Sequence, residues 1–301
     1  MKGKNLSKCL VTKEWLEANK HLVTMKESKN YPGLFVIKYK NKVFYDNLWT
    51  PELQQCRGLV LDSDYNIIVR PFDKIFNYME NGTTFDRDDI VTYTRKVNGF
   101  MGAMTYSEEY GHIYSTTGSL DSPYATLVKK HLQQYEQYVV NPNFTLLFEI
   151  CDPSNPHIIK EDEGAYLIGC VYKNGFHAIE YDLDCTAETY GMKRFKSDIG
   201  RFSDAVKLSK ECKHEGFVVR LSEDQSKFLK LKSPYYLVTK FLARKKGDSL
   251  VKMLDNINET KKTIDEEYYP LLEYLSSIKD EFTQQTEQER IKVIENFFQG
   301  Y

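Results

Sequence analysis

The sequence predicts an α+β protein built from antiparallel sheets, with flanking helices and a small helical appendage at the C-terminal end. Many short apolar runs bounded by turn residues lie between residues 90 and 235, and few helical patterns interrupt them. Strands and helices show no regular βαβ alternation, which disfavours a parallel sheet. A chain of 301 residues, 41% of them hydrophobic, is long enough for one large domain with an appendage.

Residues 1–90 form a mixed first segment. Thr12 is expected to cap a helix in TKEWLEANKHL. The apolar runs LFVIKYK and KVFYD are predicted to be strands. The run CRGLVLDSDYNIIVRPF predicts a hairpin, with strands at 59–61 and 67–69 and a turn at 62–66.

Residues 90–235 are expected to be mostly strands. The predicted strands are DIVTYTRKVNG, FMGAMTYS, HIYSTTG, FTLLFEI, YLIGCVYKNG, FHAIEY, GFVVRL and FLKLK. One helix is predicted in SPYATLVKKHLQQYEQYV, where Pro123 suits a helix start. A second is predicted in FSDAVKLSKECK, with Ser203 as its cap.

From Tyr235 onward the hydrophobic spacing is helical. We therefore expect a main domain at 1–238, with 1–90 as an extension, and a helical domain at 239–301. The densest basic run is Lys240, Arg244, Lys245 and Lys246. This run is either a solvated helix face or a contact for a nucleic-acid backbone.

Composition excludes several classes of protein. The net charge of −2 provides no overall basic field, so any nucleic-acid affinity must come from a local groove. The six cysteines contain no CxxC pair, which disfavours a zinc site or a disulfide framework and indicates a reducing compartment. No signal peptide and no apolar run of about 18 residues is found, so we expect a soluble, cytoplasmic monomer without a membrane anchor.

Five short motifs stand out in chain order. They are KVNG at 96–99, STTGS at 115–119, LLFEI at 146–150, HEGFVV at 214–219 and FLKLK at 228–232. Alone, each has an ordinary explanation: a solvated lysine, an edge-strand or turn carboxylate, or an exposed strand face. A glutamate after three apolar residues is less ordinary, because an unpaired buried carboxylate is unfavourable.

The order of the motifs is more specific than any one of them. A lysine in KxxG, a strand glutamate, EGxVV and then KxK resembles the motif series of ATP-dependent polynucleotide ligases and mRNA capping enzymes. CRG at 56–58, RPFDKIFN at 70–77, CDPSNPHI after Glu149 and KSPYY after Lys232 make the chain similar to the phage RNA ligase 1 family, to which fungal tRNA ligases are related. The likeness runs from residue 40 to 240. Asn98 replaces the frequent aspartate of KxDG, and the tail is short for this family.

Chemistry explains why these residue types belong together. Attack on the α-phosphorus of ATP needs a neutral amine, and a free lysine is protonated at neutral pH. We expect Lys230, Lys232 and a metal ion to lower the pKa of Lys96 by like-charge repulsion. Glu149 and Glu215 supply the hard oxygen ligands that Mg²⁺ prefers, with Mn²⁺ as the alternative ion.

The resemblance implies a ligase-type nucleotidyltransferase (ATP-grasp-like) fold, with 1–238 as an adenylyltransferase domain, and it assigns roles. Lys96 becomes adenylylated, Glu215 holds the metal, and Lys230 and Lys232 contact the α-phosphate. Glu149 contacts either the nucleotide ribose or the waters of the metal ion. An aromatic of YLIGCVY, Tyr166 or Tyr172, stacks on adenine. The residues implied in binding ATP are Arg57, Lys74, Lys96, Gly99, Gly118, Glu149, Tyr166, Lys230 and Lys232. Arg57 and Lys74 are the β- and γ-phosphate contacts, and Gly118 lies near the ribose.

The function implied is ATP-dependent joining of RNA 3′-hydroxyl and 5′-phosphate ends through lysyl–AMP and adenylylated RNA. Repair of broken tRNA, a viral or phage origin with action in the host cytoplasm, and a separate end-healing kinase and phosphatase fit the same family. A GTP-dependent capping guanylyltransferase or a DNA ligase would usually carry an OB-type barrel after the last lysine motif. A catalytically dead nucleotide-binding module is the remaining alternative.

Overall fold

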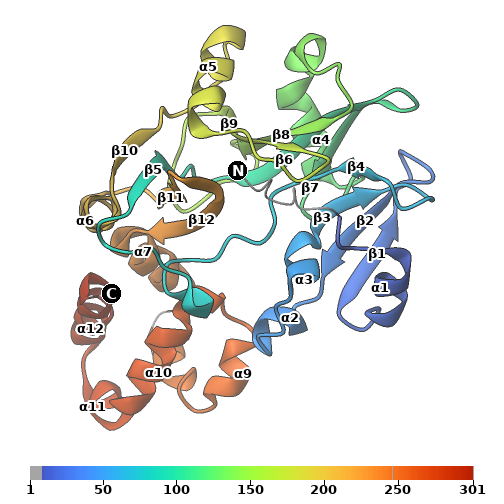
Figure 1. The fold of residues 1–301 in the computed structure, drawn as a ribbon. Coiled ribbons are helices and arrows are strands. Elements are labelled where there is room, and N and C mark those ends of the chain that lie inside the picture. The colour runs from blue at the N-terminus through green and yellow to red at the C-terminus, as the bar shows by residue number, and fades with distance from the viewer. Residues whose placement is uncertain (1–8, 246, 301) are drawn as a thin grey trace.

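The protein, described by a computed structural model over residues 9–245 and 247–300, contains three four-stranded sheets. All the strand pairs within them are antiparallel. Their orders are β1-β2-β3-β4, β10-β5-β11-β12 and β7-β6-β8-β9. Helices flank the sheets (Figure 1), so the predicted α+β class is confirmed.

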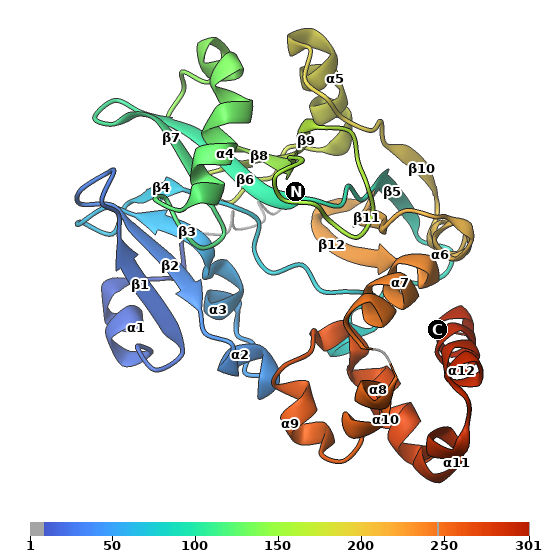
Figure 2. The same cartoon turned by 180° about the vertical axis from the view of Figure 1, so that it is seen from behind.

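Two of the sheets pack face to face. The strands of the first are β1 (Val23–Glu27), β2 (Phe35–Tyr39), β3 (Arg57–Leu61) and β4 (Ile67–Val69). Those of the second are β6 (Phe100–Ser107), β7 (Gly111–Thr116), β8 (Phe144–Cys151) and β9 (Gly164–Tyr172). Val36 and Val60 of the first sheet share one buried apolar cluster with Ala103 and Leu147 of the second. The first sheet is thus held against the centre of the molecule (Figure 2).

Helices cover the other faces. α4 (Pro123–Leu132) and α5 (Glu180–Tyr190) bury Val128 and Leu183 in a cluster with Phe148 of β8. The third sheet consists of β5 (Ile90–Arg95), β10 (Asp198–Arg201), β11 (Gly216–Leu221) and β12 (Asp224–Lys232), and α6 (Phe202–Glu211) packs on it. The KVNG and LLFEI motifs meet between this sheet and the second one, where the Gly99 amide donates to Glu149 of β8.

The C-terminal part is a helical unit with its own core. Its elements are α7 (Pro234–Arg244), α8 (Asp248–Lys252), α9 (Ile257–Lys261), the 3₁₀ helix η3 (Glu266–Tyr268), α10 (Tyr269–Ser277), α11 (Lys279–Gln284) and α12 (Glu287–Gly300). Phe241, Leu271 and Phe298 belong to a single buried cluster within it. The expected boundary at 238/239 falls inside α7, and the unit begins at Pro234. Among the described residues after Lys232 there is no strand.

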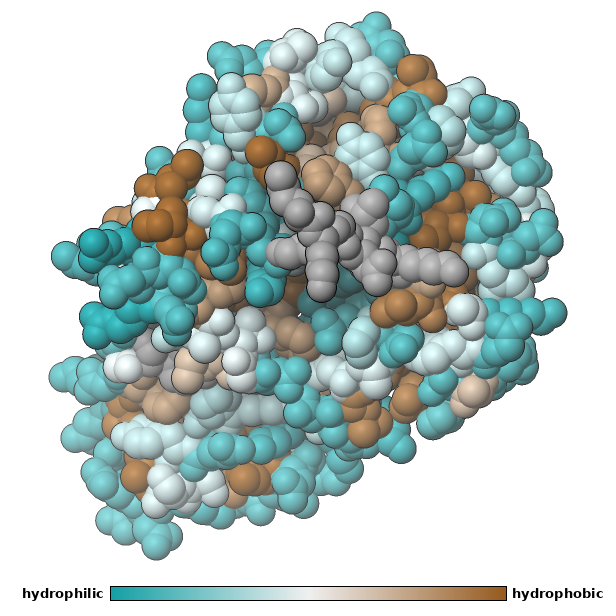
Figure 3. Space-filling view, in the orientation of Figure 1, coloured by the Kyte–Doolittle hydropathy of each residue, from teal (hydrophilic) through white to brown (hydrophobic). Residues whose placement is uncertain are grey.

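The helical unit also touches the N-terminal extension. The short helix α2 (Lys42–Tyr45) lies beside it in both ribbon views, and the Tyr45 hydroxyl donates to the backbone carbonyl of Lys262. On the face drawn in Figure 3, hydrophilic residues predominate and apolar residues form separate patches. No helix in the described residues is long and apolar enough to cross a membrane. All six cysteines are described and free.

Predictions of individual helices and strands succeed where the hydrophobic pattern extends over many residues. The 59–69 hairpin is confirmed by β3 and β4, and the Thr12 cap by its bond from the Trp15 amide in α1 (Lys13–Ala18). KVFYD was predicted as a strand and is instead α2, because four apolar-rich residues do not distinguish the two periods. The prediction of a strand in FHAIEY was also wrong, since Glu180 begins α5. Ser203 is not a cap: α6 starts at Phe202, with Arg201 before it.

Candidate active site

Backbone pairing brings three of the motifs together. Lys96 directly follows β5, and its amide donates to the carbonyl of Gly216 at 2.8 Å. Gly216 is in turn the register partner of Lys232 across the β11–β12 pair. Lys96, Glu215 and Lys232 therefore cluster at one end of this sheet.

Glu215 is the centre of the cluster. It is buried, and its Oε1 lies 3.1 Å from Lys96 Nζ and 4.0 Å from Lys232 Nζ. Its other oxygen accepts a hydrogen bond from Asn98 Nδ2 at 2.6 Å, and Asn98 Oδ1 accepts from the amide of Ile159 at 2.9 Å. The asparagine that departs from KxDG thus donates to the glutamate, which an aspartate could not do when ionised.

Glu149 comes from the neighbouring sheet. It is buried near the end of β8, and its Oε1 accepts the amide hydrogen of Gly99 at 3.1 Å. A Cβ at Gly99 would lie 2.3 Å from the carbonyl oxygen of Ile150, so only glycine lets the two segments approach this closely. At Gly118, by contrast, a Cβ would meet Lys38 Nζ at 3.8 Å, so no protein atom demands glycine there.

The charges of the lysines differ from the sequence-based expectation. Burial acts to lower the pKa of Lys96, but the carboxylates of Glu215 and Glu149 outweigh it, and the pKa is raised. The charge of Lys232 does act to lower this pKa, as expected, but without a metal ion the carboxylates outweigh it. Burial together with the charges of Lys232 and Lys74 instead lowers the pKa of Lys230 to about 7. Lys230 forms no ion pair with any described residue, although the charges of Glu80 and Glu266 act on it from a longer distance.

Lys230→Met is expected to stabilise the fold below pH 7. The folded-state pKa of Lys230 lies near 7 against an ordinary 10.5, so the unfolded chain binds more protons between these values. The wild-type penalty is full below pH 7 and vanishes toward pH 10.5. Thermal unfolding at pH 6 should show a gain on the order of 1–2 kcal/mol that disappears near pH 10. An equal gain at both pH values would mean that burial of the methyl group, and not charge, stabilises the variant.

Arg57 and Lys74 lie close enough to Lys230 for their charges to act on its pKa. The charge of Arg57 acts on the pKa of both Glu149 and Lys230, which places its guanidinium within the cluster. Lys74 is buried, with Nζ 3.1 Å from Glu80 and 2.6 Å from Glu266. Glu80 opens the 3₁₀ helix η1 (Glu80–Gly82), whereas Glu266 belongs to the helical unit.

The last motif lysine is also paired with the helical unit. Lys232 forms an ion pair with Glu267, which contacts Lys240 at 2.8 Å as well. Lys240 and Arg244 both lie within 2.8 Å of Asp265. Lys240 is thus engaged inside the protein, whereas the Arg244 side chain stays 55% exposed beside Asp265. Lys246 lies outside the described residues.

The structure separates the two candidate tyrosines. Tyr166 is the register partner of Glu149 and is buried, with its ring stacked on Phe195 at 5.6 Å. Tyr172 lies at the far end of β9 beside Phe144 and is 36% exposed. Only Tyr166 lies near the motif cluster.

The donor set fits a hard divalent cation. Glu149 and Glu215 come from different sheets, and each is close enough to Lys96 to raise its pKa. Carboxylate oxygens are the ligands that magnesium prefers. These two residues are the ones that would hold the metal ion.

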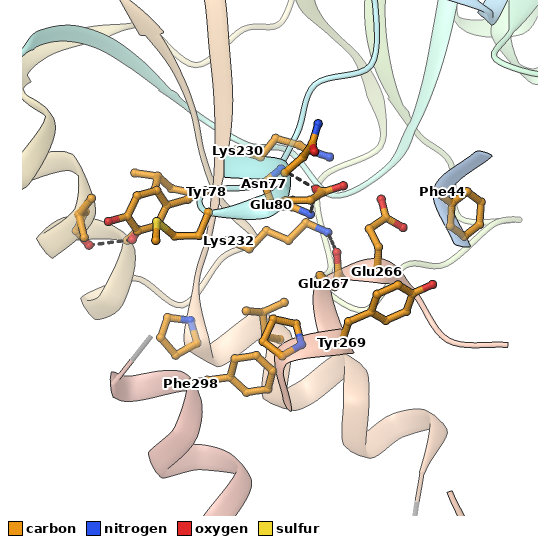
Figure 4. A pocket seen from close by; sticks show the side chains of 18 of the residues that line it. Phe44, Asn77, Tyr78, Glu80, Lys230, Lys232, Glu266, Glu267, Tyr269 and Phe298 are labelled. Atoms are coloured by element: carbon orange, nitrogen blue, oxygen red, sulfur yellow. Dashed lines mark hydrogen bonds and ion pairs between the residues drawn. The ribbon is translucent and has the colours of Figure 1, made fainter. Parts of the chain in front are cut away.

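A cavity of about 350 Å³ lies between the motif strand β12 and the helical unit. Figure 4 shows Lys230 and Lys232 on one side, Asn77 and Glu80 beside them, and Glu266 and Glu267 facing the lysines. The buried Asn77 Oδ1 has no hydrogen-bond partner among the described residues. Sequence reasoning missed the carboxylates of this cavity, because isolated glutamates at 80, 266 and 267 carry no motif.

The sheets, the KxxG lysine and the converging carboxylates and lysines define an enzyme of the nucleotidyltransferase fold. The family model described as RNA ligase matches residues 55–236. The chain therefore belongs to the RNA ligase family, which confirms the predicted enzyme class.

Solved structures share the fold. An archaeal ATP-dependent RNA ligase (form 2) is similar with a TM-score of 0.61 at 14% identity, over 96% of this chain and 76% of that one. A putative ATP-dependent DNA ligase from Aquifex aeolicus has a TM-score of 0.57 at 16% identity, over 95% and 76% of the two chains. Among curated proteins, none is similar enough in sequence to count as a relative.

Proposed function

We propose that the protein joins RNA ends with ATP, through a covalent AMP adduct on Lys96. The proposal rests mainly on the cluster of Lys96, Glu149 and Glu215 beside Lys230, a buried lysine that forms no ion pair with any described residue. Such a cluster offers a nucleophile and cations for a phosphate in one place. The RNA ligase family and the fold shared with an archaeal ATP-dependent RNA ligase support this choice.

In the first step, Nζ of Lys96 attacks the α-phosphorus of ATP. A nitrogen–phosphorus bond forms, the α–β phosphoanhydride breaks, and pyrophosphate and the amine proton leave. A magnesium or manganese ion held by Glu149 and Glu215 would offset the two carboxylate charges that raise the Lys96 pKa. Lys230 and Lys232 neutralise charge on the α-phosphate, and Arg57 and Lys74 bind the leaving pyrophosphate. Tyr166 borders the base.

In the second and third steps, AMP moves to the 5′-phosphate of one RNA end, and the 3′-hydroxyl of the other end then displaces it. Both steps again transfer a phosphoryl group, so the same lysines serve all three. By family resemblance, broken tRNA is the proposed substrate, and separate kinase and phosphatase enzymes prepare its ends in the cytoplasm.

The proposal is tested by incubation with magnesium and α-labelled ATP or GTP, followed by denaturing electrophoresis and peptide mapping. Label from ATP alone, on the peptide containing Lys96, is the expected result. Label from GTP alone would indicate a capping enzyme. Absence of label from both nucleotides would indicate a dead nucleotide-binding module.

Arg57→Ala should impair the first step yet spare sealing of a pre-adenylylated strand. The reason is that Arg57 is assigned to pyrophosphate, which takes no part after the first step. We expect adenylylation to slow by roughly 10²-fold, the usual effect of losing one phosphate contact, with sealing nearly unchanged. Equal loss in both assays would remove Arg57 from the triphosphate site.

A further inference from the structure

Two cations assigned to ATP phosphates are occupied by carboxylates from another part of the protein. Lys74 contacts Glu266 at 2.6 Å, and Lys232 forms an ion pair with Glu267. These consecutive glutamates open η3, in the helical unit. The lysines belong to the segment before β5 and to β12, so the contacts join the nucleotidyltransferase sheets to the C-terminal helices.

Charge makes these contacts strong. Lys74 and Glu267 are buried, where ion pairs are poorly screened. The Lys232 and Lys240 charges lower the pKa of Glu267 to about 2 despite its burial, and the Lys74 charge lowers that of Glu266. Both glutamates are therefore ionised at neutral pH and present two adjacent negative charges to the lysine cluster.

The Glu266–Glu267 pair occupies the place that the phosphates of ATP would take. Figure 4 shows Glu266 and Glu267 on the wall of the cavity opposite Lys230 and Asn77, with Glu267 reaching Lys232. A polyphosphate bound to Lys74 and Lys232 would meet both carboxylates, and like charges in contact repel. The two anions cannot share the lysines, so one must leave.

We propose that the Glu266–Glu267 pair is an autoinhibitory gate that occupies the triphosphate cations until a nucleotide displaces it. The inference rests on the proposed function, since it takes these lysines to be phosphate ligands. The gate withdraws by movement of η3 with the adjoining helices, whose contacts with the N-terminal extension include the hydrogen bond from Tyr45 of α2 to Lys262. The gate lowers apparent nucleotide affinity by the fraction of time it is closed.

The main test is the double variant Glu266→Gln with Glu267→Gln, which keeps side-chain shape and removes the competing charges. If the closed state holds nine-tenths of the molecules, the KM for ATP in adenylylation falls ~tenfold. A raised KM, or no change, would show that the glutamates merely orient the lysines, and would overturn the gate.

Asp265→Asn is the matched control. Asp265 is adjacent in sequence and ion-paired with Lys240 and Arg244, but it does not contact Lys74 or Lys232. Its KM for ATP should equal that of the wild type. A drop equal to that of the double variant would assign the effect to general loosening of the helical unit.

Hydrogen exchange of the wild-type protein gives a second readout. Addition of an ATP analogue with a non-cleavable α–β linkage, whose phosphates would reach both Lys232 and Lys74, should speed exchange of the amides of residues 263–270, although bound ligands usually slow exchange. Slower or unchanged exchange in this segment would mean that the acidic pair stays on the lysines. Wild-type labelling by ATP separates the two ideas: without label the proposed function fails, whereas label with an unchanged variant KM refutes the gate alone.

Discussion

Lys96→Ala is expected to abolish transfer of AMP from ATP to the protein. Its amine is the one in hydrogen-bond range of Glu215, and its backbone is fixed by the bond to Gly216. Removing a nucleophile leaves no substitute, and losses on the order of 10⁴-fold or more are usual. Gel labelling with α-labelled ATP, with a detection limit below that level, measures the effect.

Two further variants make this result specific. Lys96→Arg keeps the positive charge beside Glu215 but provides a poor nucleophile, so it should be as inactive as alanine. Lys227→Ala changes an exposed lysine on β12 and should label normally. Surviving label in Lys96→Ala would place the nucleophile elsewhere, with Lys230 the next residue to examine because its pKa lies near 7.

The sequence predicts much of this site because strand pairing is regular. Lys96, Glu215 and Lys232 each lie at the end of a predicted strand, and antiparallel pairing of β5, β11 and β12 brings those ends together. Glu149 ends an apolar run, and burial of its carboxylate next to Gly99 follows from that position. The position of each of these four residues follows from the alternation of apolar and polar residues along its strand, which is visible in the sequence.

The rest depends on contacts between distant segments. The raised pKa of Lys96 follows from the distance to Glu215, which no spacing of motifs encodes. Glu266 and Glu267 look like surface residues at the start of a helix, and only packing of the helical unit places them on Lys74 and Lys232. The type of short elements such as α2 also cannot be predicted, because four residues are too few to show a helical or a strand period.

Glu215→Gln should slow both adenylylation and sealing by about 10²–10³-fold, as expected when a carboxylate that positions a metal ion and a nucleophile is neutralised. Gln can still accept the Asn98 hydrogen bond, so the fold should persist. The variant is informative because two effects of Glu215 oppose each other. Its charge raises the Lys96 pKa, so losing it lowers that pKa and yields more neutral amine at a given pH.

Single-turnover labelling across pH and magnesium concentration separates these effects. If holding the metal ion dominates, the variant is slow at every pH and needs more magnesium, while the pH at which Lys96 becomes reactive shifts down. If Glu215 only keeps Lys96 protonated, the variant would instead label faster than the wild type at neutral pH. Loss in both steps also contrasts with Arg57→Ala, which should affect the first step alone, so the two variants together assign metal and pyrophosphate to different parts of the site.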